Sequence, residues 1–169
     1  MITESIFPLD IRVKQEAIKL KEHGHKVLII SLKNRSQKYY EIIIGINVYR
    51  IPKLEIFKLG KHLKSDNLSY FNRYFTLLKG IIGYGFEYLY FTVACFLMSF
   101  FLTLKDKIDV IHIHNPPDTL FIVALFQKVV FRNKIIFDHH DLAPDLFIEK
   151  YSQGKKFIYR LLLLLEKIS

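Results

Sequence analysis

The sequence predicts an α/β protein whose parallel β-sheet is flanked by helices. Asp109–Asp145 contains two apolar runs typical of β-strands, separated by a stretch of crossover-helix length, as in a βαβ unit. Upstream, Lys26–Leu32 is almost wholly apolar, as expected of a strand covered on both faces of a sheet. A chain of 169 residues, 51% of them hydrophobic, can build the core of one domain or of one lobe of a larger protein.

The amino-terminal part of the chain has the pattern of a helix followed by a buried strand. The helix begins at Ile11, with Asp10 placed as its N-cap and Gly24 as its stop. A buried strand after this helix implies another strand before it, of which Met1–Ser5 provides at most the last few residues. We therefore expect the chain to be truncated at its start.

Two segments of different character follow. Tyr40–Ile51 reads as a short hairpin about Gly45, ended by Pro52. Lys53–Lys79 is basic and aromatic, and we expect helical pieces there with a mobile loop around Ser65–Ser69. Such a segment either lies on a membrane surface or forms a solvated amphipathic region, and the sequence leaves both interpretations open.

Two helical segments are unusually apolar. Tyr88–Leu104 has seventeen residues without a charge, at the lower limit for a membrane span. Because a strand of the βαβ unit follows after a very short link, we expect a helix buried on the sheet face, with Cys95 as a buried, reduced thiol. The final helix, Lys155–Ile168, has an apolar face too wide for an exposed end, so we expect truncation after Ser169 as well.

The net charge of +9 is concentrated in the first half of the chain. Residues 1–80 contain 15 Lys and Arg against 7 Asp and Glu, whereas residues 81–169 contain 10 against 9. This asymmetry favours anionic lipid or phosphorylated ligands as partners, or simply a solvated lysine-rich surface. No nucleic-acid-binding motif is recognisable, and the first residues lack the build of a secretory signal. We expect a cytoplasmic protein, peripheral at the inner face of the cell membrane.

The two predicted strands of the βαβ unit end in polar loops, His114–Asp118 and Asp138–Asp145. Ligands of open parallel sheets bind where the carboxyl ends of strands meet, so any site is expected there. His112 and His114 share a strand face, and we expect His114 to reach the cleft and His112 to be a hydrogen-bonded core residue. Asp118 is expected to cap the next helix, with Thr119 as the other candidate for that cap.

The sequence Asp138-His139-His140-Asp141 also permits a metal interpretation. At most two of these four neighbours can converge on an extended segment, and His114 would add a third ligand. A metal-dependent hydrolase using His114, His139 and Asp141 is therefore an alternative enzyme class. A histidine at such a cleft can also serve as a hydrogen-bond donor or a proton carrier.

Four stretches of the chain resemble the N-terminal lobe of family 4 retaining glycosyltransferases. They are FPLDIRVKQEAIKLKEHGHKVLIISL, the hairpin ending in YRIP, DVIHIHNPPDTL and IIFDHHDLAPDL, and together they cover nearly all of residues 1–169 in the right order. The resemblance implies a Rossmann-like parallel sheet flanked by helices, as one lobe of a GT-B fold. It also implies a hexosyltransferase-type enzyme that moves a sugar from a nucleotide-sugar donor to a glycan or lipid-linked acceptor with retention.

The resemblance also assigns roles to individual residues. The cleft histidine of the family falls on His140, which we expect to be catalytic, and the Arg and Glu of its first helix fall on Arg12 and Glu16. No metal and no resident cofactor are expected, since the second lobe of such enzymes holds the nucleotide sugar, a co-substrate. The expected substrate-binding residues are Asp10, Arg12, His114, Asn115, Asp118, His139 and Asp141.

The chain departs from the family at both ends. By comparison with the family, we expect the first strand and its glycine-containing loop to be all but missing before Glu4, and the C-terminal donor lobe to be missing after Ser169. We therefore expect the 169-residue chain alone to be inactive and a separate donor lobe to be its partner. The non-enzymatic alternative is a membrane-surface or partner-binding lobe, and no nucleic-acid partner is expected.

Overall fold

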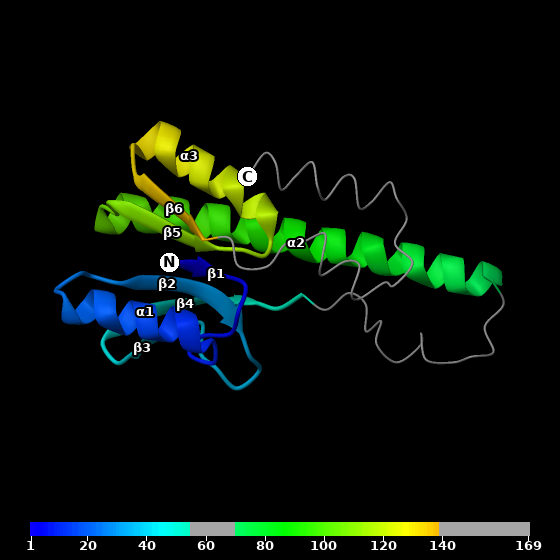
Figure 1. The fold of residues 1–169 in the computed structure, drawn as a ribbon, viewed down its shortest axis with the longest axis horizontal. Helices are drawn as coiled ribbons and strands as arrows, with labels where there is room; N and C mark the ends of the chain where they lie inside the picture. Colours follow the sequence, from blue (N-terminus) through cyan, green and yellow to red (C-terminus); the bar gives the residue numbers. More distant parts are fainter. Residues whose placement is uncertain (55–69, 139–169) are drawn as a thin grey trace.

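The computed structural model of the chain describes residues 1–54 and 70–138, and these form one mixed sheet with helices on both faces (Figure 1). The six strands lie in the order β3-β4-β2-β1-β5-β6, and all neighbours are parallel except the β3–β4 pair. The expected α/β architecture with a mostly parallel sheet is confirmed. The strands are β1 Ile2–Thr3, β2 Leu28–Lys33, β3 Tyr40–Ile43, β4 Ile46–Pro52, β5 Val110–His114 and β6 Lys134–Asp138.

The first strand is short but central. β1 contains only Ile2 and Thr3, and it pairs with β2 on one side and with β5 on the other. Both residues are buried, because they lie between two neighbouring strands and beneath helices on each face. The expectation that this segment supplies only a few strand residues is confirmed.

Helix α1, Ile11–Glu22, starts and stops where the sequence predicts. Asp10 Oδ1 accepts hydrogen bonds from the backbone N–H groups of Arg12 and Val13, at 3.1 and 3.4 Å. Gly24 follows the helix with a φ of +85°, a left-handed conformation that glycine adopts without strain. The predicted N-cap and stop are both confirmed.

The predicted hairpin is also present, with β3 and β4 antiparallel around the turn at Ile44-Gly45. β4 has a second role that the hairpin pattern did not reveal, since its other edge pairs in parallel with β2 along Leu28–Lys33. The hairpin therefore extends the main sheet instead of standing apart from it.

Helix α2, Tyr70–Asp106, is 37 residues long and connects β4 to β5. Its carboxyl-terminal half packs on the sheet, while its amino-terminal end extends past the sheet (Figure 1). Phe91, Cys95 and Leu102 are buried in the core, which confirms the expected sheet-facing helix and the buried cysteine. Within the described residues, Gly85–Asp106 is also long and apolar enough to cross a membrane by length and composition.

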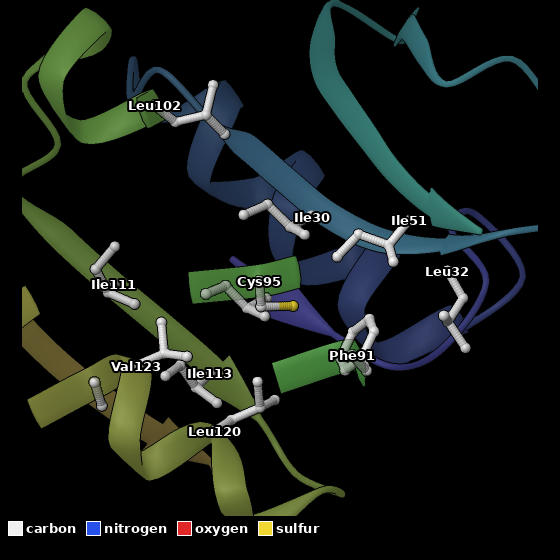
Figure 2. Packing of buried hydrophobic residues seen from close by; sticks show 12 residues of the cluster. Ile30, Leu32, Ile51, Phe91, Cys95, Leu102, Ile111, Ile113, Leu120 and Val123 are labelled. Carbon is white, nitrogen blue, oxygen red and sulfur yellow. The ribbon is translucent and has the colours of Figure 1, made fainter. Parts of the chain in front are cut away.

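The sheet separates two hydrophobic clusters. The larger cluster contains side chains of α2 and α3 (Phe121–Phe131) packed on one sheet face, as Figure 2 shows for Cys95, Ile113 and Val123. The smaller cluster lies under α1 on the opposite face and includes Phe7 and Val13. Because α1 contacts the β2–β4 half of the sheet, the two clusters leave room for polar side chains on the α1 side of β5 and β6.

The predicted βαβ unit is confirmed as β5, a short 3-10 helix η2 (Asp118–Leu120), α3 and the parallel strand β6. The predicted cap is wrong. Asp118 is the first residue of η2 instead of its N-cap, and neither η2 nor α3 has a side-chain cap among the described residues. The Thr119 hydroxyl lies 2.6 Å from that of Thr92 on α2. The expected loop around Ser65–Ser69 and the expected helix Lys155–Ile168 lie outside the described residues.

Candidate functional site

A row of polar side chains crosses the sheet on the face that α1 covers. Strand register places Ser31 beside Arg50, Thr3 beside His114, and His114 beside Asp138. The pairing of Ile2 with Ile30 puts Ser31 next to Thr3, so five adjacent strands each contribute one member. The row lies near the carboxyl ends of the parallel strands, the edge where the sequence predicts a site.

Two histidines of β5 lie at the centre of this face. His112 and His114 are two residues apart, so their side chains point to the same side of the sheet, and their rings stack with centroids 4.3 Å apart. His114 is only 3% exposed and His112 is 9% exposed. His112 is thus buried, as expected of a core residue, whereas His114 is even less exposed. The expectation that His114 reaches a ligand cleft stays a prediction.

Each histidine ring lies between two carboxylates from different elements. Glu16 of α1 approaches His112 Nδ1 with Oε1 at 3.1 Å and His114 Nε2 with Oε2 at 3.7 Å. Asp138, at the end of β6, places Oδ2 3.4 Å from His114 Nδ1 and 4.0 Å from His112 Nε2. These four residues are called the His–carboxylate cluster below.

The His–carboxylate cluster can act as a cation site. Taking one donor atom from each residue, the four donors all lie within 4.8 Å of one another. Two imidazole nitrogens and two carboxylate oxygens are a ligand set that zinc and related divalent metals accept. The sequence predicted His112 as a core residue and Glu16 only as a residue of the family's first helix. Two histidines at positions i and i+2, followed by a strand that ends in Asp138, could have indicated the cluster.

A pocket gives the cluster an opening to solvent. It has a volume of about 510 Å³, lies by the amino ends of β2 and β5, and includes Glu16 and His112 in its wall. The Met1 amino group also lines it and donates a hydrogen bond of 2.7 Å to the Leu28 carbonyl. Burial lowers the pKa of this amino group to about 6, although the Glu16 carboxylate opposes that shift.

The predicted residues Asn115 and Asp118 lie in the loop after β5 and bond to each other. Asn115 Nδ2 donates to Asp118 Oδ1 at 3.0 Å, and both residues are about 95% buried. The Asn115 N–H also donates to the Asp138 carbonyl at 3.1 Å, which ties this loop to the end of β6. Asn115 therefore lies beside the cluster, and its bond to Asp118 holds the loop together.

The predicted residues Asp10 and Arg12 lie at the start of α1. Asp10 uses Oδ1 to cap the helix, and Arg12 Nε lies 3.7 Å from the same oxygen with its side chain largely exposed. They are separate from the His–carboxylate cluster, which α1 reaches through Glu16. His139, His140 and Asp141 lie outside the described residues, so the catalytic role of His140 stays a prediction.

Arg50, at the far end of the polar row, is a buried cation that the sequence did not single out. Its Nη1 donates to the Lys38 carbonyl at 3.0 Å and lies 3.0 Å from Glu41 Oε2. Its Nε and Nη2 are buried and have no hydrogen-bond partner within residues 1–54 and 70–138. In the sequence, a strand arginine that will be buried cannot be distinguished from one that will be exposed.

The chain matches no protein-family model, no curated protein and no solved structure.

Proposed function

We propose that the chain is the acceptor-binding lobe of a family 4 retaining glycosyltransferase, built as a Rossmann-like lobe of a GT-B fold. In this proposal the complete enzyme moves a sugar from a nucleotide-sugar donor to a glycan or lipid-linked acceptor. The acceptor binds at the carboxyl edge of the sheet, and a second lobe holds the donor. Two observations support this proposal. One is the resemblance of the four sequence stretches to the family, and the other is the order of the strands in the sheet.

The strand order is the structural observation that supports this proposal best. From β1 the chain moves outward to β2 and β4, then returns through α2 to β5 on the other side of β1 and continues outward to β6. The direction of winding therefore reverses between β1 and β5, where Thr3 pairs with His114. Ligands of open α/β sheets bind in the crevice at such a switch point. His140 follows Asp138, the last residue of β6, by two positions.

Membrane association is the second candidate function, and one surface of α2 favours it. Six apolar side chains spaced by three or four residues share one exposed side of this helix, opposite its core-facing side, and form what we call the α2 apolar stripe. Each is 49–64% exposed in the described part of the chain. The stripe comprises Phe86, Leu89, Val93, Leu97, Phe101 and Leu104. Together with the basic first half, it suits the surface of an anionic bilayer.

Binding measurements test the leading proposal without requiring turnover. The purified chain is expected to bind sugar-linked polyprenyl phosphate analogues or oligosaccharides, and to bind UDP and GDP weakly or not at all. His140→Ala and Arg12→Ala should weaken acceptor binding, and Arg35→Ala, in an exposed turn, is the matched control.

Two results would count against the proposal. Tight nucleotide binding without acceptor binding would place the donor on this chain. Turnover of a nucleotide sugar by the chain alone would contradict the proposal that a second lobe binds the donor.

A further inference from the structure

We infer that Glu16, His112, His114 and Asp138 form a binding site for one divalent transition-metal ion of the zinc type. This inference rests on the described side chains alone and is independent of the proposed function. It departs from the expectation that the protein uses no metal.

The donor chemistry selects the class of metal. Two imidazole nitrogens favour zinc, iron, copper or nickel over magnesium and calcium, which prefer oxygen ligands. Both histidines are at least 91% buried, and the two carboxylates are partly buried. The cluster therefore brings two anionic groups to a site with little water, where a divalent cation would neutralise them.

One donor atom from each of the four residues can converge on a single ion. Bonds of about 2.0–2.2 Å to nitrogen and oxygen place tetrahedral donors about 3.3–3.6 Å apart. Each imidazole ring faces Glu16 with one nitrogen and Asp138 with the other, at separations from 3.1 to 4.0 Å. When each residue contributes one donor atom, the four donors lie within 4.8 Å of one another, so the side chains must turn and draw closer to enclose an ion.

The strands and the helix that carry the four donor residues hold them in fixed positions, unlike residues that meet by chance on a surface. His112 and His114 are fixed by the register of β5 between β1 and β6, and Asp138 is paired with His114 in that register. Glu16 comes from α1, whose start is fixed by the Asp10 cap. The pocket of about 510 Å³ that Glu16 and His112 line provides the route of entry for an ion.

An ion held in this way links α1, β5 and β6, which are far apart in the sequence. Metal that binds only the folded chain raises its stability by mass action. We therefore expect zinc to raise the melting temperature of the wild-type chain, in addition to occupying the site.

Metal binding is measured on the 169-residue chain after chelator treatment and dialysis, by titration with Zn²⁺ and with Co²⁺. One equivalent should bind, and Co²⁺ should give the intense visible absorption of a tetrahedral site. Glu16→Gln and His112→Asn should each weaken binding at least about tenfold and abolish the zinc-dependent rise in melting temperature. Matched controls are Glu22→Gln on the same helix and His23→Asn just after it, both exposed and outside the cluster.

Three outcomes would overturn the inference. The first is a wild-type chain that binds no stoichiometric zinc. The second is binding that Glu16→Gln and His112→Asn leave unchanged. The third is binding that depends on His139 and Asp141 but not on the cluster. Burial of the Cys95 thiol identifies variants that are still folded, so a loss of binding in a folded variant is informative.

Discussion

Gln127 of α3 donates a hydrogen bond from Nε2 to Ser99 Oγ of α2 at 3.1 Å, and both side chains are buried. The other amide atom, Oε1, accepts bonds from Thr103 Oγ1 at 3.1 Å and from Asn133 Nδ2 at 3.0 Å. One glutamine therefore joins two helices and the start of the loop before β6 through a satisfied buried network.

Replacing Gln127 with leucine should lower the free energy of unfolding by about 2–4 kcal/mol, because Ser99 and Asn133 lose buried partners. Chemical denaturation, followed by circular dichroism, measures this change. Lys128→Ala, at the neighbouring exposed position of α3, is the control and should alter stability by less than about 0.5 kcal/mol. Equal effects of the two substitutions would show that the network contributes nothing specific.

The amino-terminal cap of α1 gives a second prediction. Asp10→Ala removes the oxygen that accepts from the N–H groups of Arg12 and Val13, and should destabilise the chain by about 1 kcal/mol. Arg12→Ala removes only an exposed ion pair with Asp10 at 3.7 Å, so its effect on the denaturation midpoint should be near zero. A large loss of stability for Arg12→Ala would show that this side chain has a structural role.

The sequence predicted correctly those elements that are determined by short stretches of the chain. The cap at Asp10 and the turn at Gly45 depend on residues close together in the chain, and the parallel pair β5–β6 depends on the length of a single helical crossover. All three are present. The Asp118 cap failed for a local reason, since the backbone turns into η2 one residue earlier than the pattern suggested.

The His–carboxylate cluster could be predicted only in part, because its members come from three distant segments. That His112 and His114 share a face follows from strand geometry alone. That Asp138 lies beside His114 follows from parallel register, which no single-strand pattern fixes. That Glu16 reaches both rings depends on where α1 crosses the sheet, a property of packing with no signature in the sequence.

The Cys95 thiol reports global unfolding. Burial raises its pKa well above the ordinary value, with a smaller contribution in the same direction from Glu4. The native thiol should therefore resist alkylation at pH 8 and react only when the chain unfolds, since the thiolate is the reactive form. Iodoacetamide labelling with and without denaturant measures the protection, and rapid labelling of the native chain would contradict it.

The same shift predicts the direction of a pH effect on stability. Between the unfolded pKa of about 8.5 and the higher native value, the native state binds more protons at Cys95 than the unfolded state does. Stability should therefore fall as the pH rises above about 8.5. Cys95→Ala should flatten this alkaline slope, and an unchanged slope in the variant would assign the effect to other groups.

The α2 apolar stripe gives the last prediction, which concerns membranes. If the stripe lies on a bilayer, Leu97→Gln combined with Phe101→Gln should weaken binding to vesicles containing anionic lipid at least about tenfold, since each side chain contributes apolar area. Both residues are at least half exposed, so the free energy of unfolding should change little. Vesicle co-sedimentation measures the binding.

Ile42→Gln is the control for this experiment, because Ile42 is 60% exposed on β3 and lies far from α2 in the sequence. Adding salt should weaken the wild-type interaction further, since the basic first half of the chain supplies the electrostatic attraction to the lipid. Binding that is unaffected by the stripe substitutions but is lost in salt would mean that basic residues alone hold the protein at the membrane. In that case the stripe would be left as a surface for another protein, and the second lobe of the proposed enzyme would be the first partner to test.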